Sequence, residues 1–388
     1  MNHPSFSGPA LASVHSPEAS ATALDPAIMR VRGVHRAIAD LRRGTPVLLT
    51  GEVPLVLLAA ETASAGGLAE FAALATDPPL LLLAPMRAAS VLHRPVQQGQ
   101  PAMALRLSAA LLAPEMLLSL ADPTVEQMLP ELPELAPAPV LAAAALALVK
   151  LTRLLPAVLA APVGPGAVAV TERRHLLSVP AEDVLAYPSA SALGLKPVAE
   201  ASVPLRSAEQ TRIVAFRAPD AGIEHLAILV GRPEESEAPL VRIHSECFTG
   251  DLLGSMRCDC GEQLRGAIAR MAEAGSGALI YLAQEGRGIG LVNKLRAYAL
   301  QDRGLDTLDA NRALGWGADE RNFLVAATIL EALGISRIRL LTNNPDKLAA
   351  LAACGVTIVG REAHAFAPNG VNDHYLATKA ERFGHLLD

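Results

Sequence analysis

The sequence predicts a protein of α/β class, with mixed α+β character, that folds as two domains. The chain has 388 residues, a length that is typical of two domains. Hydrophobic residues make up 51% of it, which is enough for two packed cores, although aromatic residues are only 3% and Leu, Ala and Val must fill most of the interior. In the second half, short apolar runs alternate with segments of helical spacing, a pattern typical of α/β domains.

Composition divides the chain into three parts. Residues 1–26 are rich in Ser, Ala and Pro, and we expect them to be disordered. Residues 27–195, dominated by Ala, Leu and Pro, form the predicted first domain. Residues 196–388 hold all four cysteines and the single tryptophan, and they form the predicted second domain. The boundary is placed near Lys196 because the chain becomes small and polar over residues 181–195.

The first half contains few clear elements. A helix is predicted from Val31, where apolar residues recur at helical spacing, to Gly44, a typical helix end. Two buried strands are predicted over residues 46–50 and 80–83. Residues 123–139 contain several prolines, so we expect them to be rich in loops.

The second half is predicted to alternate between strands and helices. Asn344 followed by Pro345 has the form of a helix start, with Asn as the cap and Pro at the first helical position. A glycine loop covers residues 286–290. The other expected elements are strands over residues 278–282 and 338–341 and helices over residues 291–301 and 323–333.

The charge and the termini limit the function classes. A formal net charge of −6 argues against a broad nucleic-acid-binding surface, which would be basic, but it allows a locally basic pocket for a small anion. The first residues lack the basic start and apolar run of a secretory signal, and the longest apolar runs are too short to span a membrane. We therefore expect a cytoplasmic protein, in which cysteines are more often metal ligands or catalytic groups than disulfides.

Three cysteines predict a zinc site. Cys247, Cys258 and Cys260 form the pattern C-x(10)-C-x-C. Three thiolates without an obvious fourth cysteine leave one position open for water or substrate, as in catalytic zinc sites. Two alternatives stay open: a structural zinc completed by a histidine such as His244, or three inert buried thiols. Cys354 lies at the end of a predicted helix and is interpreted as a packing residue.

Two strand-to-helix turns could bind anions. Residues 284–290 read Gln-Glu-Gly-Arg-Gly-Ile-Gly, and small residues at a helix start let backbone amides approach a phosphate. Arg287, Lys294 and Arg296 add positive charge there. A tight turn with solvated basic residues is the alternative. Residues 342–347 form the second turn, which could hold a base or a phosphate, although a helix cap alone would explain it.

Asp319 and Arg321 are a further candidate pair. In the middle of a helix, a spacing of two residues would point them in different directions. At a helix start, with Asp319 near the cap, both could face one pocket. The alternative is simple capping by Asp319 beside a surface arginine.

Together these segments resemble the GTP cyclohydrolase II family from about Val198 to the C-terminus. The matching motifs are residues 241–251 (Val-Arg-Ile-His-Ser-Glu-Cys-Phe-Thr-Gly-Asp), 257–263 (Arg-Cys-Asp-Cys-Gly-Glu-Gln), 284–294, 296–298, 306–307, 314–321, 341–345 and 372–379. So many motifs in one order make the resemblance specific.

The resemblance implies an activity. Members of this family hydrolyse GTP to 2,5-diamino-6-ribosylamino-4(3H)-pyrimidinone 5′-phosphate, formate and pyrophosphate, the first step of riboflavin biosynthesis. The chain is therefore expected to use one zinc ion, which activates water for attack on C8 of guanine, and to take Mg²⁺ with the triphosphate. It is also expected to be a homodimer without a nucleic-acid or membrane partner.

The resemblance also implies roles for individual residues. Cys247, Cys258 and Cys260 match the zinc ligands. Asp319 matches a general acid/base, and Arg321 matches the residue proposed to attack the α-phosphate as pyrophosphate leaves. A clamp on transition-state charge stays open for Arg321, because a guanidinium remains protonated. The remaining matches are Tyr298, near the guanine ring and linked to deformylation, and the GTP contacts Arg242, Ile243, His244, Ser245, Glu246, Gln263, Glu285, Gly286, Arg287, Thr307, Thr342 and Lys347.

The first half carries a fainter resemblance. Residues 42–50 resemble the start of 3,4-dihydroxy-2-butanone 4-phosphate synthase, an enzyme often fused to GTP cyclohydrolase II. That enzyme needs an acidic loop next, whereas residues 51–58 read Gly-Glu-Val-Pro-Leu-Val-Leu-Leu. We therefore interpret residues 27–195 as a degenerate, synthase-like domain with a structural or dimer-forming role.

Three other functions compete with this interpretation. A GTP-binding regulatory protein with lapsed catalysis would not need the cysteines, Asp319, Arg321 and Tyr298. A cyclohydrolase that stops at the formylated intermediate is disfavoured by Tyr298. A zinc nucleobase deaminase would match the H-x-E form of residues 244–246, but the P-C-x-x-C partner of that motif is absent.

Overall fold

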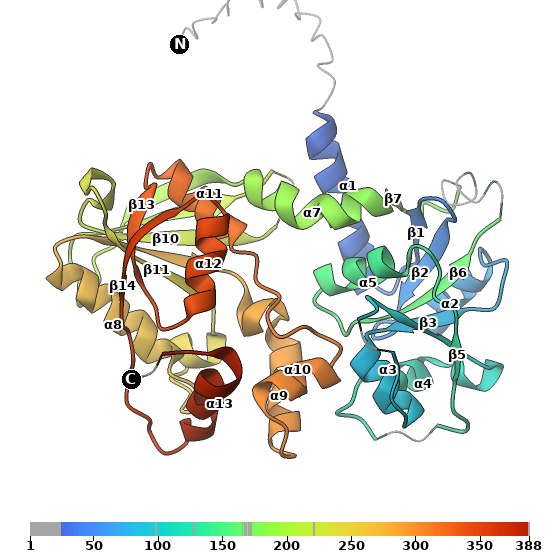
Figure 1. The fold of residues 1–388 in the computed structure, drawn as a ribbon. Coiled ribbons are helices and arrows are strands. Elements are labelled where there is room, and N and C mark those ends of the chain that lie inside the picture. The colour runs from blue at the N-terminus through green and yellow to red at the C-terminus, as the bar shows by residue number, and fades with distance from the viewer. Residues whose placement is uncertain are drawn as a thin grey trace, which may run out of the picture.

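The protein forms two lobes, each built around one sheet (Figure 1). The computed structural model describes residues 25–386 apart from residues 98, 127–128, 165, 167–168, 170–172 and 220–221. We call residues 25–195 the first lobe and residues 196–386 the second lobe. The expectation of disorder over residues 1–26 lies outside the described residues, except that Asp25 and Pro26 begin the first helix.

The first lobe has a seven-stranded sheet in the order β5-β4-β3-β6-β2-β1-β7. Neighbouring strands are antiparallel, apart from the parallel pair β1 and β7. Its elements are α1 (Pro26–Arg42), β1 (Val47–Thr50), β2 (Leu55–Ala59), α2 (Ala65–Ala72), β3 (Leu80–Leu83), α3 (Pro85–Leu92), β4 (Met103–Arg106), a 3₁₀ turn (Ala109–Leu111), α4 (Pro114–Ala121), β5 (Glu134–Ala136), α5 (Ala142–Leu151), β6 (Ala157–Pro162), β7 (Ser178–Pro180) and α7 (Ala181–Leu193).

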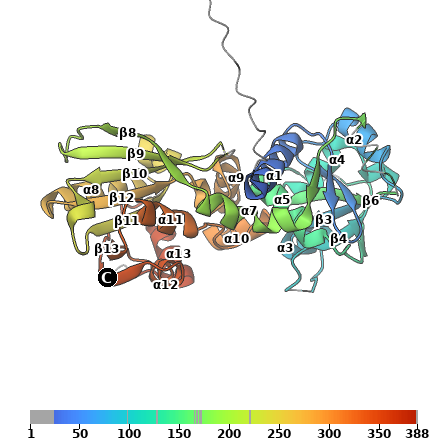
Figure 2. The same ribbon diagram turned by 90° about the horizontal axis from the view of Figure 1, so that it is seen from above.

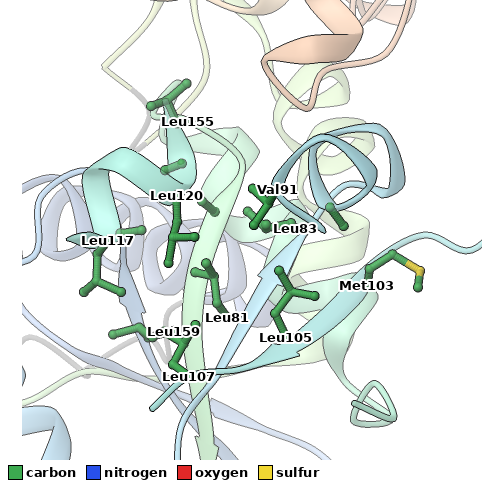
Figure 3. Packing of buried hydrophobic residues seen from close by; sticks show 14 of the residues in the cluster. Leu81, Leu83, Val91, Met103, Leu105, Leu107, Leu117, Leu120, Leu155 and Leu159 are labelled. Atoms are coloured by element: carbon green, nitrogen blue, oxygen red, sulfur yellow. The ribbon is translucent and has the colours of Figure 1, made fainter. Parts of the chain in front are cut away.

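Both faces of this sheet are buried, which explains its continuous apolar strands. Side chains alternate between the two faces of a strand. In β2, Val56 and Leu58 therefore pack into one core, whereas Leu55 and Leu57 pack into the core on the other face. Figure 3 shows the first of these cores, where leucines of β3, β4 and β6 meet those of α4. Strands covered on both faces read as apolar runs without alternation.

The second lobe has a sheet in the order β14-β13-β11-β12-β10-β9-β8. Its elements are β8 (Lys196–Ser202), β9 (Thr211–Arg217), β10 (Glu224–Val230), a 3₁₀ turn (Pro233–Glu235), β11 (Leu240–Ser245), a π-helical turn (Phe248–Leu252), α8 (Cys260–Glu273), β12 (Gly277–Leu282), a 3₁₀ turn (Glu285–Gly288), α9 (Leu291–Gln301), α10 (Thr307–Ala313), α11 (Leu324–Ala332), β13 (Arg337–Leu341), α12 (Pro345–Ala353), β14 (Thr357–Glu362) and α13 (Asp373–Phe383). Strands β12, β11, β13 and β14 run parallel, whereas β8, β9 and β10 are antiparallel.

An apolar seam joins the lobes. Helices α9 and α10 of the second lobe lie against the first lobe in both views (Figures 1 and 2). Side chains of these helices and of the residues beside them are buried in the same hydrophobic cluster as one face of the first lobe's sheet. The second-lobe members of this cluster are Ile289, Ala297, Leu300, Ala310, Leu314 and Trp316. The two lobes therefore share one hydrophobic core at this point.

Most of the predicted elements are present, with one clear difference. Residues 181–195 were expected to be a polar junction, but residues 181–193 form helix α7 despite the internal Pro188. Val184 and Tyr187 are buried in the first lobe's core, and Asn322 of the second lobe donates to the Pro188 carbonyl at 2.8 Å. Tertiary contacts thus hold a helix that propensity alone would not predict. None of the described helices is both long and apolar enough to cross a membrane.

Candidate active site at the ends of three parallel strands

Three neighbouring parallel strands, β12, β11 and β13, end at one edge of the second lobe's sheet, and a pocket lies beyond them. The segments that follow these strands begin at Glu246, Ala283 and Thr342. In open α/β sheets, ligands bind outside the carboxyl ends of the strands. The pocket is lined by Arg242, His244, Ser245, Glu246, Cys247, Arg257, Cys258, Cys260, Gln263, Glu285, Gly286, Arg287, Ile289, Lys294, Ala297, Tyr298, Gln301, Thr307, Asn311, Arg321, Thr342, Asn343, Asn344, Lys347, Tyr375, Lys379 and His385.

The three cysteines of the C-x(10)-C-x-C pattern meet in this pocket. The Sγ atoms of Cys247, Cys258 and Cys260 all lie within 4.8 Å of one another. A Cβ atom on Gly250 would lie 2.8 Å from the Cys258 Sγ and 3.0 Å from the Cys247 Sγ, so only glycine leaves room for the cluster. Since three thiolates are a donor set that zinc prefers, the residues fit this metal.

His244 does not join the cysteines. Its Nε2 lies 3.2 Å from both carboxylate oxygens of Asp251, and its ring stacks on that of Tyr281. Among the described residues, the group of close metal-ligating side chains at this place contains only the three thiols. The alternative in which His244 completes a structural site therefore has no support from the geometry.

Lys294 places a positive charge beside the thiols. Its Nζ lies 3.1 Å from the Cys247 Sγ and 2.9 Å from the Glu285 Oε1. Hydrogen bonds from the other two thiols, and then Lys294, hold the pKa of Cys247 far below its usual range. The same coupling raises the pKa of Cys258 to about 11 and also raises that of Cys260. The Lys294 ammonium therefore stabilises a thiolate at Cys247.

Tyr298 lines the same pocket as the three thiols. Its hydroxyl is 3.5 Å from the Thr249 hydroxyl. The guanidinium of Arg257 lies 5.0 Å from the centre of its ring, and the Lys294 ammonium lies 5.8 Å from it. Burial raises the pKa of the Tyr298 phenol, so its proton is retained at neutral pH. The side chain can therefore donate a hydrogen bond near the cluster.

The glycine loop has the tight backbone that its sequence predicts. Gly286 and Arg287 both have left-handed backbone angles, with φ of +64° and +63°. Arg287 is a non-glycine residue in this region, and its guanidinium lies 3.9 Å from the ring centre of Phe383. Burial, and then Arg321, lower the pKa of Arg287 against the opposing effect of nearby Tyr375 and Asp319.

The expected source of charge for this loop is partly wrong. Lys294 lies in the pocket, but it faces Cys247 and Glu285. Arg296 points away from the pocket and pairs with Glu61 at 2.9 Å and Asp122 at 2.8 Å in the first lobe. Residues 294 and 296 lie on different sides of helix α9, which is why sequence proximity misplaced one of them.

Several cations also line the pocket. Arg242 donates to the Leu341 carbonyl at 3.1 Å and to Gln263, and Lys347 donates to the Ile243 carbonyl at 3.0 Å. Burial lowers the pKa of Arg242 to about 10. Burial, and then the charges of Arg321 and Arg242, lower the pKa of Lys347 well below its usual range. Cations that lie this close together are suited to binding a polyanion.

Asp319 and Arg321 lie next to each other in a non-helical stretch before α11. The guanidinium of Arg321 binds both carboxylate oxygens of Asp319. Arg321 lines the pocket, whereas Asp319 does not. Burial works against ionisation of Asp319, but Arg321 holds the pKa of that carboxyl below its usual value. Neither arrangement that the sequence allowed is present in full: the pair precedes α11, whose N-cap is Phe323, and Arg321 lines the pocket without Asp319.

The other predicted contact residues are nearly all in the pocket. Ile243 is the exception, because its side chain is buried in the lobe's core and only its carbonyl faces Lys347. Cys354 packs at the edge of that same core, in agreement with its interpretation as a packing residue. The predicted contacts that line the pocket are Arg242, His244, Ser245, Glu246, Gln263, Glu285, Gly286, Arg287, Thr307, Thr342 and Lys347.

Sequence reasoning missed the contribution of the C-terminal helix. Tyr375, Lys379 and His385 line the pocket from α13 and the residues after it. Lys379 binds Asp259 between two of the cysteines at 2.5 Å. The motif over residues 372–379 was the available signal, but nothing in its spacing assigned it a partner more than 100 residues away in the chain.

The fold and the site together define an α/β protein in which a cluster of three thiols and several cations line one pocket. A sequence profile of the GTP cyclohydrolase II family matches residues 196–363. GTP cyclohydrolase-2 of Azospirillum brasilense is 58% identical over 247 residues, which are 63% of this chain and 64% of that protein. GTP cyclohydrolase-2 of Shigella boydii is 50% identical over 194 residues, half of this chain and 98% of that protein. The chain belongs to the GTP cyclohydrolase II family.

The comparisons also cover the first lobe. GTP cyclohydrolase-2 of Xylella fastidiosa is 40% identical over 358 residues, which are 91% of this chain and 87% of that protein. Both lobes therefore occur together in a relative. Among solved structures, RibBX, a two-domain 3,4-dihydroxy-2-butanone 4-phosphate synthase from A. baumannii, aligns with 85% of this chain and 99% of its own length, at 17% identity and a TM-score of 0.34.

Proposed function

We propose that this protein is a zinc-dependent GTP cyclohydrolase II that hydrolyses GTP to 2,5-diamino-6-ribosylamino-4(3H)-pyrimidinone 5′-phosphate, formate and pyrophosphate, the first step of riboflavin biosynthesis. One observation carries the proposal: a single pocket holds the three thiols of residues 247, 258 and 260 together with the cations Arg242, Arg287, Arg321 and Lys347. A nucleoside triphosphate has the matching shape, with a base to be opened and a polyanionic chain.

The base belongs at the thiol cluster in this proposal. Cys247, Cys258 and Cys260 would hold one zinc ion, which supplies a Lewis acid that activates water for attack on C8 of guanine. Tyr298 retains its proton and can donate it as a hydrogen bond to the opened ring, where the formyl group is released. Lys294 keeps a compensating positive charge beside the thiolates.

The triphosphate belongs among the cations. A guanidinium that stays protonated is a poor nucleophile. Arg321 is also held by hydrogen bonds to both carboxylate oxygens of Asp319. We therefore assign to Arg321 the stabilisation of charge on the leaving pyrophosphate, and to Asp319 the orientation of Arg321 and an acid/base role. Mg²⁺ would enter with the triphosphate, whose oxygen atoms are the hard ligands it prefers.

Product analysis tests this function directly. Purified protein is incubated with GTP, and mass spectrometry follows the diaminopyrimidinone, formate and pyrophosphate. Retention of the formyl group in the product would favour a cyclohydrolase that stops early. Binding of GTP without turnover would favour a regulatory protein. Release of ammonia in place of formate would favour a deaminase.

The first lobe is proposed to be structural. The dihydroxybutanone phosphate synthase reaction needs carboxylates to hold magnesium and move protons. Glu52 is alone in its exposed loop, and Glu61 and Asp122 are both engaged by Arg296. We predict no conversion of ribulose 5-phosphate by the full-length protein above a no-enzyme control. Measurable conversion would overturn the degenerate assignment.

The assembled state is proposed to be a cytoplasmic homodimer, as the family resemblance implies. The exposed hydrophobic side chains of helix α7, Leu185 and Leu193, offer apolar area for a contact between copies. Light scattering of the purified protein measures the mass, and a monomer at micromolar concentration would contradict the dimer.

A further inference from the structure

The first lobe contacts the two segments that carry the proposed phosphate chemistry. One is the glycine loop of residues 285–290, and the other is the turn of residues 317–321, which contains Asp319 and Arg321. Glu320 lies in this turn, between Asp319 and Arg321 of the proposed site. Lys150, at the end of helix α5 in the first lobe, approaches Glu320 from outside the second lobe.

Glu320 links the turn to the loop. Its Oε1 accepts a hydrogen bond from the Gly317 amide at 2.7 Å, which closes the turn. Its own amide donates to the Arg287 carbonyl at 3.1 Å. A Cβ atom on Gly288 would lie 2.8 Å from the Glu320 carbonyl oxygen, so the turn and the loop pack backbone to backbone.

Lys150 is the cation that holds Glu320 in place. Its Nζ lies 2.5 Å from the same Glu320 oxygen that accepts from Gly317. Both side chains are only about a quarter exposed, at 27% and 26%. The ammonium also lies 5.6 Å from the ring centre of Trp316, a residue of the shared core. The Glu320 carboxylate and the Trp316 ring together fix the position of the Lys150 ammonium.

A second residue of the first lobe, Arg153, contacts the chain on both sides of the glycine loop. Arg153 donates to the Ala283 carbonyl at 2.6 Å, directly before the loop, and its own carbonyl accepts from the Asn293 amide group at 2.9 Å. A Cβ atom on Gly290 would lie 3.2 Å from the Arg153 side chain. The loop is therefore held by the first lobe at both ends.

The family does not supply this arrangement in general. The 194 residues of the Shigella boydii relative that align with this chain are 98% of that protein, so it is too short to contain both lobes. A residue such as Lys150 is then an addition that belongs to chains with a first lobe, and its effect can be separated from the chemistry of the second lobe.

We propose that Lys150 is a positioning residue: through Glu320 it fixes the Gly317–Arg321 turn against the glycine loop, so that Arg321 is aimed at the phosphate chain of the substrate. The part of this statement that concerns phosphate rests on the proposed function. The first lobe is on this view a working part of the active site, because it sets the position of Arg321 without touching the substrate.

The experiment compares Lys150→Gln, Lys150→Arg, Glu320→Gln and the double variant Lys150→Gln/Glu320→Gln in the full-length protein. We expect Lys150→Gln to lower kcat for pyrophosphate release by roughly 10- to 100-fold, because small misplacements of a catalytic group have effects of this size. KM for GTP should stay near the wild-type value, and Lys150→Arg should restore most of the rate. The double variant should be no slower than the slower single variant.

Arg303→Ala is the matched control. Arg303 also joins the two lobes, because it donates to the carbonyls of Pro123 and Thr124 at 3.4 and 2.9 Å. Neither contact involves the Gly317–Arg321 turn or the glycine loop. It should leave kcat unchanged. An equal fall in kcat for Arg303→Ala, or a wild-type kcat for Lys150→Gln, would overturn the proposal.

Hydrogen exchange gives a second measurement that needs no activity. The amides of Gly317 and Glu320 are donors in the contacts described above, so they should exchange faster in Lys150→Gln and not in Arg303→Ala. Unchanged exchange at both amides would refute the positioning role even if GTP were not the substrate. Absence of formate and pyrophosphate from the wild type would instead refute the proposed function alone.

Discussion

The two lobes use sheets of equal strand number for different purposes. In the first lobe nearly all neighbouring strands are antiparallel, so successive strand ends alternate between opposite edges of the sheet. In the second lobe β12, β11 and β13 are parallel, so the segments after them meet at one edge. Polar side chains gather where those segments converge. Strand direction, rather than sheet size, thus decides which lobe holds a chemical site.

The contrast extends to the charged residues. The carboxylates Glu61 and Asp122 of the first lobe are used to hold Arg296 of the second. In the second lobe, Arg242 and Lys347 have only backbone and amide acceptors, and burial lowers the pKa of both. Arg296 is thus used to join the lobes, whereas Arg242 and Lys347 form no ion pair among the described residues and line the pocket, where they could meet a substrate.

The largest effect is expected in the thiol cluster. Cys258→Ser should lose zinc and lower ring opening by at least about 100-fold, since loss of outer partners of a metal ligand alone has effects of about 10- to 100-fold. Metal content by mass spectrometry and formate release measure both. Cys354→Ser, in the packed core of the same lobe, is the control and should retain the metal. Full turnover in a zinc-free preparation would contradict the zinc mechanism.

The seam between the lobes should be the next most sensitive place. Arg296→Met removes the ion-pair partner of Glu61 and Asp122, whose side chains are 15% and 5% exposed. Breaking such a buried pair should lower the free energy of unfolding by about 3 kcal/mol.

Denaturant unfolding of Arg296→Met measures this loss. The exposed seam variant Arg303→Ala should change the free energy of unfolding by less than about 0.5 kcal/mol. Equal losses in both variants would show that the lobes are held by apolar contact alone.

The cationic side of the pocket should separate the two chemistries. Arg321→Ala should lower pyrophosphate release by about 100-fold, the effect of removing one group that stabilises developing charge. Arg312→Ala, a surface arginine on α10 that is 46% exposed, should leave release unchanged. Pyrophosphate release at the normal rate in Arg321→Ala would show that the phosphate role is misassigned.

A smaller effect is expected for a histidine that faces the seam. His225 is buried, and burial followed by the charge of Arg153 lowers its pKa to about 4. The unfolded chain takes up a proton below about pH 6.5 and the folded protein does not until about pH 4, so stability should fall as the pH falls through this window. Between pH 7 and pH 5 this contribution is about 2 kcal/mol.

His225→Asn tests that pH dependence. The asparagine oxygen can accept the hydrogen bond from the Ala283 amide that the His225 Nδ1 now accepts at 3.0 Å. The variant has no proton to gain, so its stability should change less between pH 7 and pH 5, whatever its absolute stability. An unchanged pH dependence in denaturant unfolding would mean that His225 titrates normally in the folded state.

Local sequence patterns predicted the helices and strands well where an apolar run, a helical periodicity or a helix cap was enough to define the element. The leucine run of β3 and the helix α9 have the bounds that were expected, and Asn344 caps α12 by accepting from the Asp346 amide at 2.9 Å. Helix α7 was not predicted, because Pro188 and the small residues around it oppose a helix. Its buried contacts with the first lobe are long-range and leave no local signal.

The sequence by itself determined the family, the three thiols and most of the pocket residues, because each depends on residue type and order within short motifs. Tertiary structure alone decided that Arg296 faces the first lobe and that Lys150 reaches Glu320. It alone also brought α13 over the pocket. The physical reason is that a contact between residues far apart in the chain is fixed by how helices and sheets pack, and side-chain direction there follows from packing that no local pattern encodes.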